Sequence, residues 1–193
     1  MTRMPNSGFD VAPVSQPIAG SDDELVMDML STGRGTIYSF QGMRRKLGLH
    51  QEKLTRILRR FEDDNLVMKT DEGYTGLRSS GHKGRRQDVV YGEPVIRGHL
   101  PTGTNLDMIM SRLKGRWFKN FRWLGYTSND REQSMCWITE DGRSQVRVEL
   151  TPVEVLVWAE NATGTKEVSS PVPAAYELFD RISHLLPGPG ENS

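Results

Sequence analysis

Apolar residues recur at helical spacing in three stretches of the first third of the chain. The three stripes are Leu25, Val26, Met29 and Leu30; Phe40, Met43 and Leu47; and Leu54, Ile57, Leu58 and Phe61. Residues three, four and seven positions apart share one face of a helix, so each stripe predicts an amphipathic helix. Ser21 is a typical residue to begin such a helix, and Gly48 is a typical residue to end one.

A hairpin is predicted directly after the third helix. The segment LVMKTDEGYTGL, residues 66–77, contains two short strand-like runs separated by Asp71, Glu72 and Gly73. Turn-forming residues between two such runs are typical of a β-hairpin. The first part of the chain is therefore predicted to contain three helices followed by a hairpin.

The pattern changes to that of β-strands after residue 94. Strands are predicted at residues 94–100 and in runs that start at Phe121, Ser134, Ser144 and Val153. The run from Ser144 alternates cleanly between apolar and polar residues, as expected for a strand with one buried face. Between the second and third of the last four runs, Asp141-Gly142 predicts a tight two-residue hairpin turn.

Two further apolar stripes predict helices among these strands. Their residues are Leu106, Ile109, Met110 and Leu113, and then Ala175, Leu178, Phe179, Ile182 and Leu185. The predicted order is β-α-β-β-β-β-α, and its short connections favour antiparallel neighbours.

Three segments lack any periodic pattern. Residues 1–20 and 188–193 are rich in Pro, Gly, Ser and Asn, which predicts disordered tails. The segment RSSGHKGRRQD, residues 78–88, is basic and has no apolar side chain, so residues 78–93 are predicted to be a linker. The chain is thus predicted to be an α+β protein with domains at residues 21–77 and 94–187.

The composition limits the partners that the whole molecule can attract. The 193 residues include 25 Lys and Arg and 25 Asp and Glu, so any attraction to a polyanion must be local. The single cysteine, Cys136, excludes an internal disulfide framework and is typical of a reducing compartment. No run of about 18 apolar residues occurs. We therefore expect a cytoplasmic protein without a membrane partner.

Positive charge is concentrated in the second and third predicted helices. Between Met43 and Arg60 the chain carries seven basic residues and one acidic residue, Glu52. The basic residues of the third helix lie off its apolar stripe, so they stay in water when the stripe is buried. Such a local concentration is expected where a protein contacts phosphates.

Residues 22–77 resemble the winged helix-turn-helix regulators of archaea and bacteria, both in element order and in the turn KLGLHQEKLTRILRRFEDDNLV. The resemblance implies a third helix that lies in the major groove of double-stranded DNA and a hairpin that contacts the flanking backbone. The residues then expected to bind DNA are Arg44, Arg45, Lys46, His50, Gln51, Lys53, Arg56, Arg59, Arg60 and Lys69. Further backbone contacts are expected from Arg78, Lys83, Arg85 and Arg86 of the linker, unless these residues are only solvated.

Individual roles follow from position on the third helix. His50 and Gln51 begin the helix and could reach base edges, while Lys53 and Arg56 are candidates for base or phosphate contacts. His50 could instead serve only as a helix cap.

An alternative is that these charges only solvate a surface. Glu52 with Arg56, Arg59 with Asp63, and Arg60 with Asp64 are spaced to pair along the helix. Exposed pairs of this kind contribute only about 0.3 to 0.5 kcal/mol, which is too little to keep an arginine from a phosphate. A winged helix that binds protein in a chromosome or basal-transcription complex is the alternative function.

Residues 94–187 are similar, in topology and length only, to one repeat of the TATA-binding-protein-like fold. This resemblance implies one sheet with both helices on one face, and its strands carry apolar residues on both faces. The uncovered face, with Trp123, Trp137 and Trp158, is expected to bind a second copy of the chain. A small-molecule effector is the second choice and nucleic acid the third. Alternatively, the N-terminal domain covers this face.

Motifs for catalysis and for cofactor or metal binding are absent from the sequence. It contains no GxxxxGK[ST], GxGxxG, HExxH or CxxC pattern, and His50, His82, His99 and His184 are scattered. Cys136 lies within a predicted strand and is expected to be a buried structural residue. We therefore expect a protein that is not an enzyme and that binds no cofactor or metal.

Overall fold

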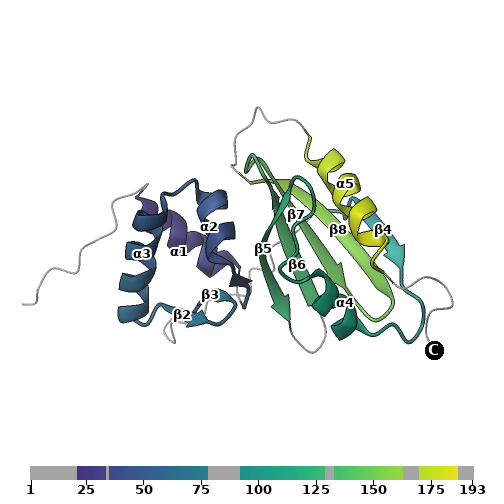
Figure 1. The fold of residues 1–193 in the computed structure, drawn as a ribbon, viewed down its shortest axis with the longest axis horizontal. Helices are drawn as coiled ribbons and strands as arrows, with labels where there is room; N and C mark the ends of the chain where they lie inside the picture. The colour runs from purple at the N-terminus through teal and green to yellow at the C-terminus, as the bar shows by residue number, and fades with distance from the viewer. Residues whose placement is uncertain (1–20, 34, 78–91, 129–132, 163–169, 187–193) are drawn as a thin grey trace, which may run out of the picture.

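The protein is an α+β structure in which the strands form one sheet. The computed structural model describes residues 21–33, 35–77, 92–128, 133–162 and 170–186. Within these residues it contains five helices and an eight-stranded antiparallel sheet, which confirms the predicted α+β class (Figure 1). The predicted tails and nearly all of the predicted linker, with its four basic residues, lie outside the described residues.

The N-terminal unit, residues 21–77, contains the three predicted helices and the hairpin. Its elements are α1 (Asp22–Thr32), β1 (Ile37–Tyr38), α2 (Phe40–Leu47), α3 (Gln51–Asp63), β2 (Val67–Thr70) and β3 (Gly73–Gly76). The hydroxyl of Ser21 caps α1 by accepting a hydrogen bond from the Glu24 amide, and Gly48 ends α2 with a φ of 65°. The predicted stripes form the core of this unit, where Val26, Met43 and Leu54 are fully buried. Leu25 of the first stripe is the exception, because it is exposed.

The C-terminal unit, residues 92–186, has the predicted order of strands and helices. Its elements are β4 (Ile96–His99), α4 (Leu106–Leu113), β5 (Phe121–Ser128), β6 (Gln133–Thr139), β7 (Ser144–Leu150), β8 (Glu154–Asn161) and α5 (Val172–Ser183). Strands β5 to β8 form a meander, and β4 pairs with the outer edge of β8. Helices α4 and α5 cover one face of this sheet (Figure 1), where their apolar residues join the core.

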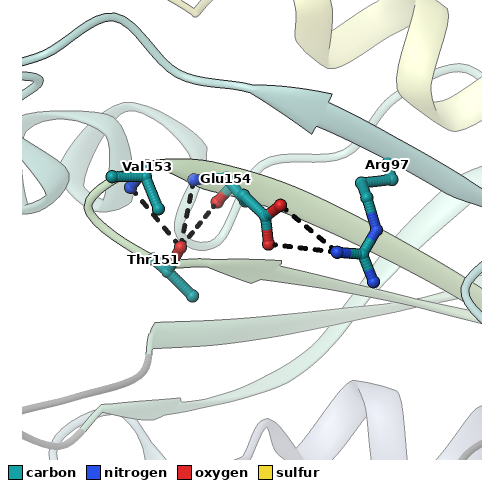
Figure 2. Close-up of polar contacts among 4 residues, drawn as sticks. All are labelled: Arg97, Thr151, Val153 and Glu154. Atoms are coloured by element: carbon teal, nitrogen blue, oxygen red, sulfur yellow. Dashed lines mark hydrogen bonds and ion pairs between the residues drawn. The ribbon is translucent and has the colours of Figure 1, made fainter.

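Side-chain contacts fix the outer edge of the sheet, as Figure 2 shows. The Thr151 hydroxyl accepts a hydrogen bond from the Glu154 amide at 3.0 Å and so closes the turn between β7 and β8. The guanidinium of Arg97 on β4 forms an ion pair with the Glu154 carboxylate at 3.2 Å. These contacts tie the edge strand β4 to the start of β8.

The two units share their sheet through β1, a strand that the sequence pattern does not predict. Tyr38 pairs with Tyr74 of β3 on one side and with Gly125 of β5 on the other. The absence of a side chain at Gly125 matters here, because a Cβ at this position would collide with the Ile37 carbonyl oxygen. The sheet order is therefore β2-β3-β1-β5-β6-β7-β8-β4.

Helix α2 covers the second face of the sheet over β5 and β6. Leu124 and Cys136 point to this face and belong to the core of the N-terminal unit. Gly42 of α2 lies so close that a Cβ there would be 2.6 Å from the Cα of Leu124. The N-terminal unit therefore covers the second face of the sheet over these two strands, which was one of the alternatives for that face.

The three tryptophans expected on an open face lie on different faces of the sheet. Trp137 is fully buried and Trp123 nearly so, both in the core beneath α4 and α5. Trp123 and Leu124 are consecutive on β5, so they point to opposite faces of the sheet and belong to different cores. Trp158 lies on the other face from Trp137, half-buried, and its indole Nε1 donates a hydrogen bond to the Gly92 carbonyl at 2.9 Å. Trp123 and Trp137 are therefore core residues and not a surface for a partner.

Candidate nucleic-acid interface

Helix α3 lies on the side of the N-terminal unit that is remote from the C-terminal unit (Figure 1). Its stripe of Leu54, Ile57, Leu58 and Phe61 is buried, which turns the remaining positions outward. The exposed residues of this outer face include Gln51, Lys53, Arg56, Arg59 and Arg60. His50 occupies the N-cap position and makes no capping hydrogen bond with its side chain, so the imidazole is not used as a cap.

The basic residues of α3 fall into two groups. Lys53 forms an ion pair with Asp22, and Arg60 forms one with Asp23, so the first turn of α1 partly neutralises α3. Arg60 thus pairs with α1 and not with Asp64 of its own helix. Arg56 and Arg59 have no ion-pair partner within the part of the chain that the structure describes.

The basic residues of α2 point elsewhere. The Lys46 ammonium donates a hydrogen bond to Oε1 of Gln145 on β7 at 2.6 Å, and the Arg45 guanidinium lies over the ring of Trp117. Both therefore face the C-terminal unit. Arg44 instead borders a hollow of about 390 Å³ at the start of α3, together with Leu49, His50, Gln51 and Glu52.

The hairpin of the N-terminal unit is held against the C-terminal unit at its tip. Lys69 on β2 is exposed, whereas the Glu72 carboxylate at the turn lies 2.5 Å from the ammonium of Lys114 and accepts a hydrogen bond from the Tyr126 phenol. The hydrogen bonds from Lys114 and Tyr126 hold the pKa of Glu72 below its ordinary range. The hairpin is thus fixed relative to both α3 and the C-terminal unit.

A cluster of arginines surrounds an exposed tryptophan between the two units. The Cζ atoms of Arg45 and Arg122 lie 5.3 and 5.0 Å from the centroid of the Trp117 ring. Burial, together with the charges of Arg122 and Arg44, lowers the pKa of Arg45. Neither Trp117 nor Arg122 is among the residues predicted from the sequence. The signal that could have found them is the segment GRWFKNFR, residues 115–122, in which aromatic and basic residues are mixed between α4 and the start of β5.

A second hollow of about 360 Å³ lies between the units and is within the size range of small-molecule sites. The charged groups that border it are Asp28 of α1, Lys46 of α2 and Glu160 of β8, and its apolar wall includes Leu25 and Met29.

The chemistry of the single thiol is that of a structural cysteine. Cys136 is buried between the sheet and α2, and this burial raises the pKa of its thiol to about 11. In the described ranges, no group of three or more His, Cys, Asp or Glu side chains is placed to hold a metal ion.

Comparison of the chain with protein-family models, with curated proteins and with solved structures found no match. No helix in the described part of the chain is both long and apolar enough to cross a lipid bilayer.

Proposed function

We propose that this chain is a DNA-binding transcription regulator that contacts double-stranded DNA through a winged helix in residues 21–77. The observation that carries the proposal is the outer face of α3, where Arg56 and Arg59 are exposed and have no ion-pair partner among the described residues. Unpaired guanidiniums on an exposed helix are suited to phosphate and guanine contacts, because each offers a planar set of donors.

The proposal gives a role to each part of the N-terminal unit. Helix α3 would enter the major groove, with Gln51 near its start and Arg56 one turn further on. Lys69 of the hairpin would contact the flanking backbone. Lys53 and Arg60 are held in ion pairs with Asp22 and Asp23. We therefore expect them to contribute less to DNA affinity than Arg56 and Arg59.

The proposal includes a homodimer, since regulators of this class read paired half-sites through two copies of the third helix. Light scattering at the protein concentration used for DNA titration distinguishes a monomer from a dimer. If the chain is a monomer and still binds DNA, the homodimer part of the proposal is wrong and the DNA-binding part stands.

Titration with random duplex DNA at two salt concentrations tests the proposal. The logarithm of the association constant should fall steeply with the logarithm of salt, with a slope of about −0.9 for each phosphate contacted. The double variant Arg56→Ala/Arg59→Ala should bind more weakly, and its salt slope should be smaller by about one for each phosphate that it no longer neutralises. Selection from a pool of random duplexes then tests for a preferred operator.

The matched control is Arg112→Ala/Arg181→Ala, which removes two exposed helical arginines from α4 and α5. It has the same net charge as the α3 variant and should bind DNA as the unaltered chain does. If the unaltered chain binds no duplex at low salt, the DNA-binding proposal is removed in favour of a protein-binding assembly function. Equal reductions in affinity in the two double variants would indicate a nonspecific effect of net charge.

A further inference from the structure

Trp117 is exposed at the junction of the two units and is contacted by guanidiniums from both. Its side chain is 58% exposed, although exposing the large apolar surface of a tryptophan to water is unfavourable. Arg45 belongs to α2 of the N-terminal unit, and Arg122 belongs to β5 of the C-terminal unit. The ring therefore lies where it can order two cations by cation–π attraction, although the Arg122 side chain is itself only 13% exposed.

The cluster has more positive charge than its neighbours compensate. Arg122 pairs with Glu140 at 2.7 Å, but Arg45 has no carboxylate within ion-pair distance among the described residues. The Nη1 atom of Arg45 is buried and has no hydrogen-bond partner in the same residues. A buried donor without a partner is unfavourable, so a shift of this guanidinium toward an approaching anion would break no existing hydrogen bond of Nη1.

Arg44 extends this cluster of basic residues toward the start of α3. Arg44 borders the hollow that also contains His50 and Gln51, and it precedes Arg45 on α2. The charges of Arg44 and Arg122 both act on Arg45, so the three arginines lie close to one another. A band of positive charge thus runs from the N-terminus of α3 across α2 to the C-terminal unit.

We propose that Arg44, Arg45, Trp117 and Arg122, here called the arginine–tryptophan patch, bind the phosphate backbone of the same duplex that α3 contacts. This inference rests on the proposed function and assigns part of the DNA interface to the C-terminal unit. Phosphate is favoured over an unpaired base because two guanidiniums already lie over the Trp117 ring, where a base would otherwise stack. Phosphate oxygens would accept hydrogen bonds from Arg44 and Arg45. Arg122 already donates to the Lys119 carbonyl and to Glu140, so it would contribute through its charge.

Duplex length separates this contact from the contact made by α3. A duplex of about 10 base pairs covers about one turn of the groove, whereas one of about 20 base pairs extends the backbone past α3. On the longer duplex, Arg45→Gln should weaken binding about fivefold to tenfold and should reduce the salt slope by about one. On the shorter duplex the same variant should bind nearly as the unaltered chain does.

Trp117→Leu provides a second variant that keeps every charge and changes an exposed position. It should weaken binding to the longer duplex by a smaller factor, about twofold to fivefold, because the guanidiniums lose their orienting ring. Arg181→Gln is the charge-matched control and should not change binding to either duplex. Thermal unfolding of each variant checks that the fold is retained.

Three results would overturn the inference. Arg45→Gln and Trp117→Leu could bind both duplexes as the unaltered chain does while Arg56→Ala/Arg59→Ala binds more weakly, which would leave the proposed function standing. A reduction in affinity with Trp117→Leu that is larger on a single strand than on a duplex of equal length would identify an unpaired base as the ligand. Failure of the unaltered chain to bind any duplex would remove this inference and the proposed function together.

Discussion

The ammonium nitrogen of Lys114 lies 2.5 Å from the carboxylate oxygen Oε1 of Glu72. Lys114 follows α4 directly, and Glu72 is at the tip of the hairpin between β2 and β3. This ion pair therefore adds a contact between the two units to the β1–β5 pairing and the packing of α2. The same ammonium lies 3.9 Å from the centroid of the Tyr126 ring. The hairpin is therefore held between α3 and the C-terminal unit.

Replacing Glu72 with glutamine should destabilise the protein slightly and in a pH-dependent way. The hydrogen bond from Lys114 lowers the pKa of Glu72 in the folded state. A lowered carboxyl pKa contributes stability above the unfolded-state value of about 4.3, and this stability is lost as the pH falls through the folded-state value. Glu72→Gln should thus cost roughly 0.3 to 1 kcal/mol at pH 7, because the pair is partly exposed. At acidic pH the free energies of unfolding of Glu72→Gln and of the unaltered chain should become equal.

At alkaline pH the stability that this ion pair contributes depends on the protonation of Lys114. Burial alone would lower the pKa of Lys114, but hydrogen bonds to Glu72 and Tyr126 outweigh it and raise the pKa overall. The contribution of Lys114 is present below its unfolded-state pKa and is lost as the pH rises through the raised value. Urea unfolding of Glu72→Gln and the unaltered chain at several pH values measures both limits. A difference between them that is constant from acid to neutral pH would contradict the role of this ion pair.

Neutralising the acids of α1 should strengthen DNA binding. Asp22 and Asp23 hold Lys53 and Arg60 in ion pairs, so Asp22→Asn/Asp23→Asn frees two cations beside Arg56. Affinity for duplex DNA should rise about tenfold at low salt and less at high salt, because exposed charges are screened. Removing negative charge at the start of α1 should also cost about 0.3 to 1 kcal/mol of stability for each substitution.

The control for this prediction changes net charge equally but elsewhere. Glu93→Gln/Asp180→Asn removes two acids of the C-terminal unit that lie outside the first turn of α1. If the two double variants raise affinity to the same extent, the effect belongs to net charge, and the ion pairs of α3 do not restrain DNA binding.

Local patterns predicted the elements that depend on local physics. All five helices and the strands of the meander lie where the apolar spacing places them, because amphipathic periodicity fixes which face is buried. The two-residue strand β1 is too short to show a period, and its partners Tyr74 and Gly125 are distant in the chain. The Asp141-Gly142 turn differs in detail: four residues separate Thr139 from Ser144, with Gly142 at a φ of 73°.

The candidate site was predicted in part for the same reason. The exposure of Arg56 and Arg59 follows from the stripe of α3 alone. Helical spacing suggested a partner for Arg60 on its own helix, but the packing of α1 across α3 brings Asp23 to it. The contact of Arg45 with Trp117 depends on how the two units pack together, which no local pattern in the sequence describes.

Cys136 should be unreactive in the folded protein. Its thiol is buried between the sheet and α2, and burial raises its pKa to about 11, so little thiolate exists at neutral pH. A thiol reagent at pH 8 should react with it only at the rate at which the protein opens, and at once in denaturant. Rapid reaction of the native chain, with a rate independent of urea below the unfolding transition, would contradict the packing of α2 on β6.

Gly42→Ala should destabilise the protein by weakening the contact of α2 with β5, although alanine normally favours a helix over glycine by about 1 kcal/mol. The added methyl would lie 2.6 Å from the Cα of Leu124, and a backbone atom of a central strand cannot move aside as a flexible side chain does. We expect a net decrease of roughly 1 to 3 kcal/mol in the free energy of unfolding. Gly92→Ala is the control, because a Cβ there meets no atom within 4 Å. Stabilisation by Gly42→Ala would mean that α2 does not pack on β5, and it would contradict the core that Leu124 of β5 shares with the N-terminal unit.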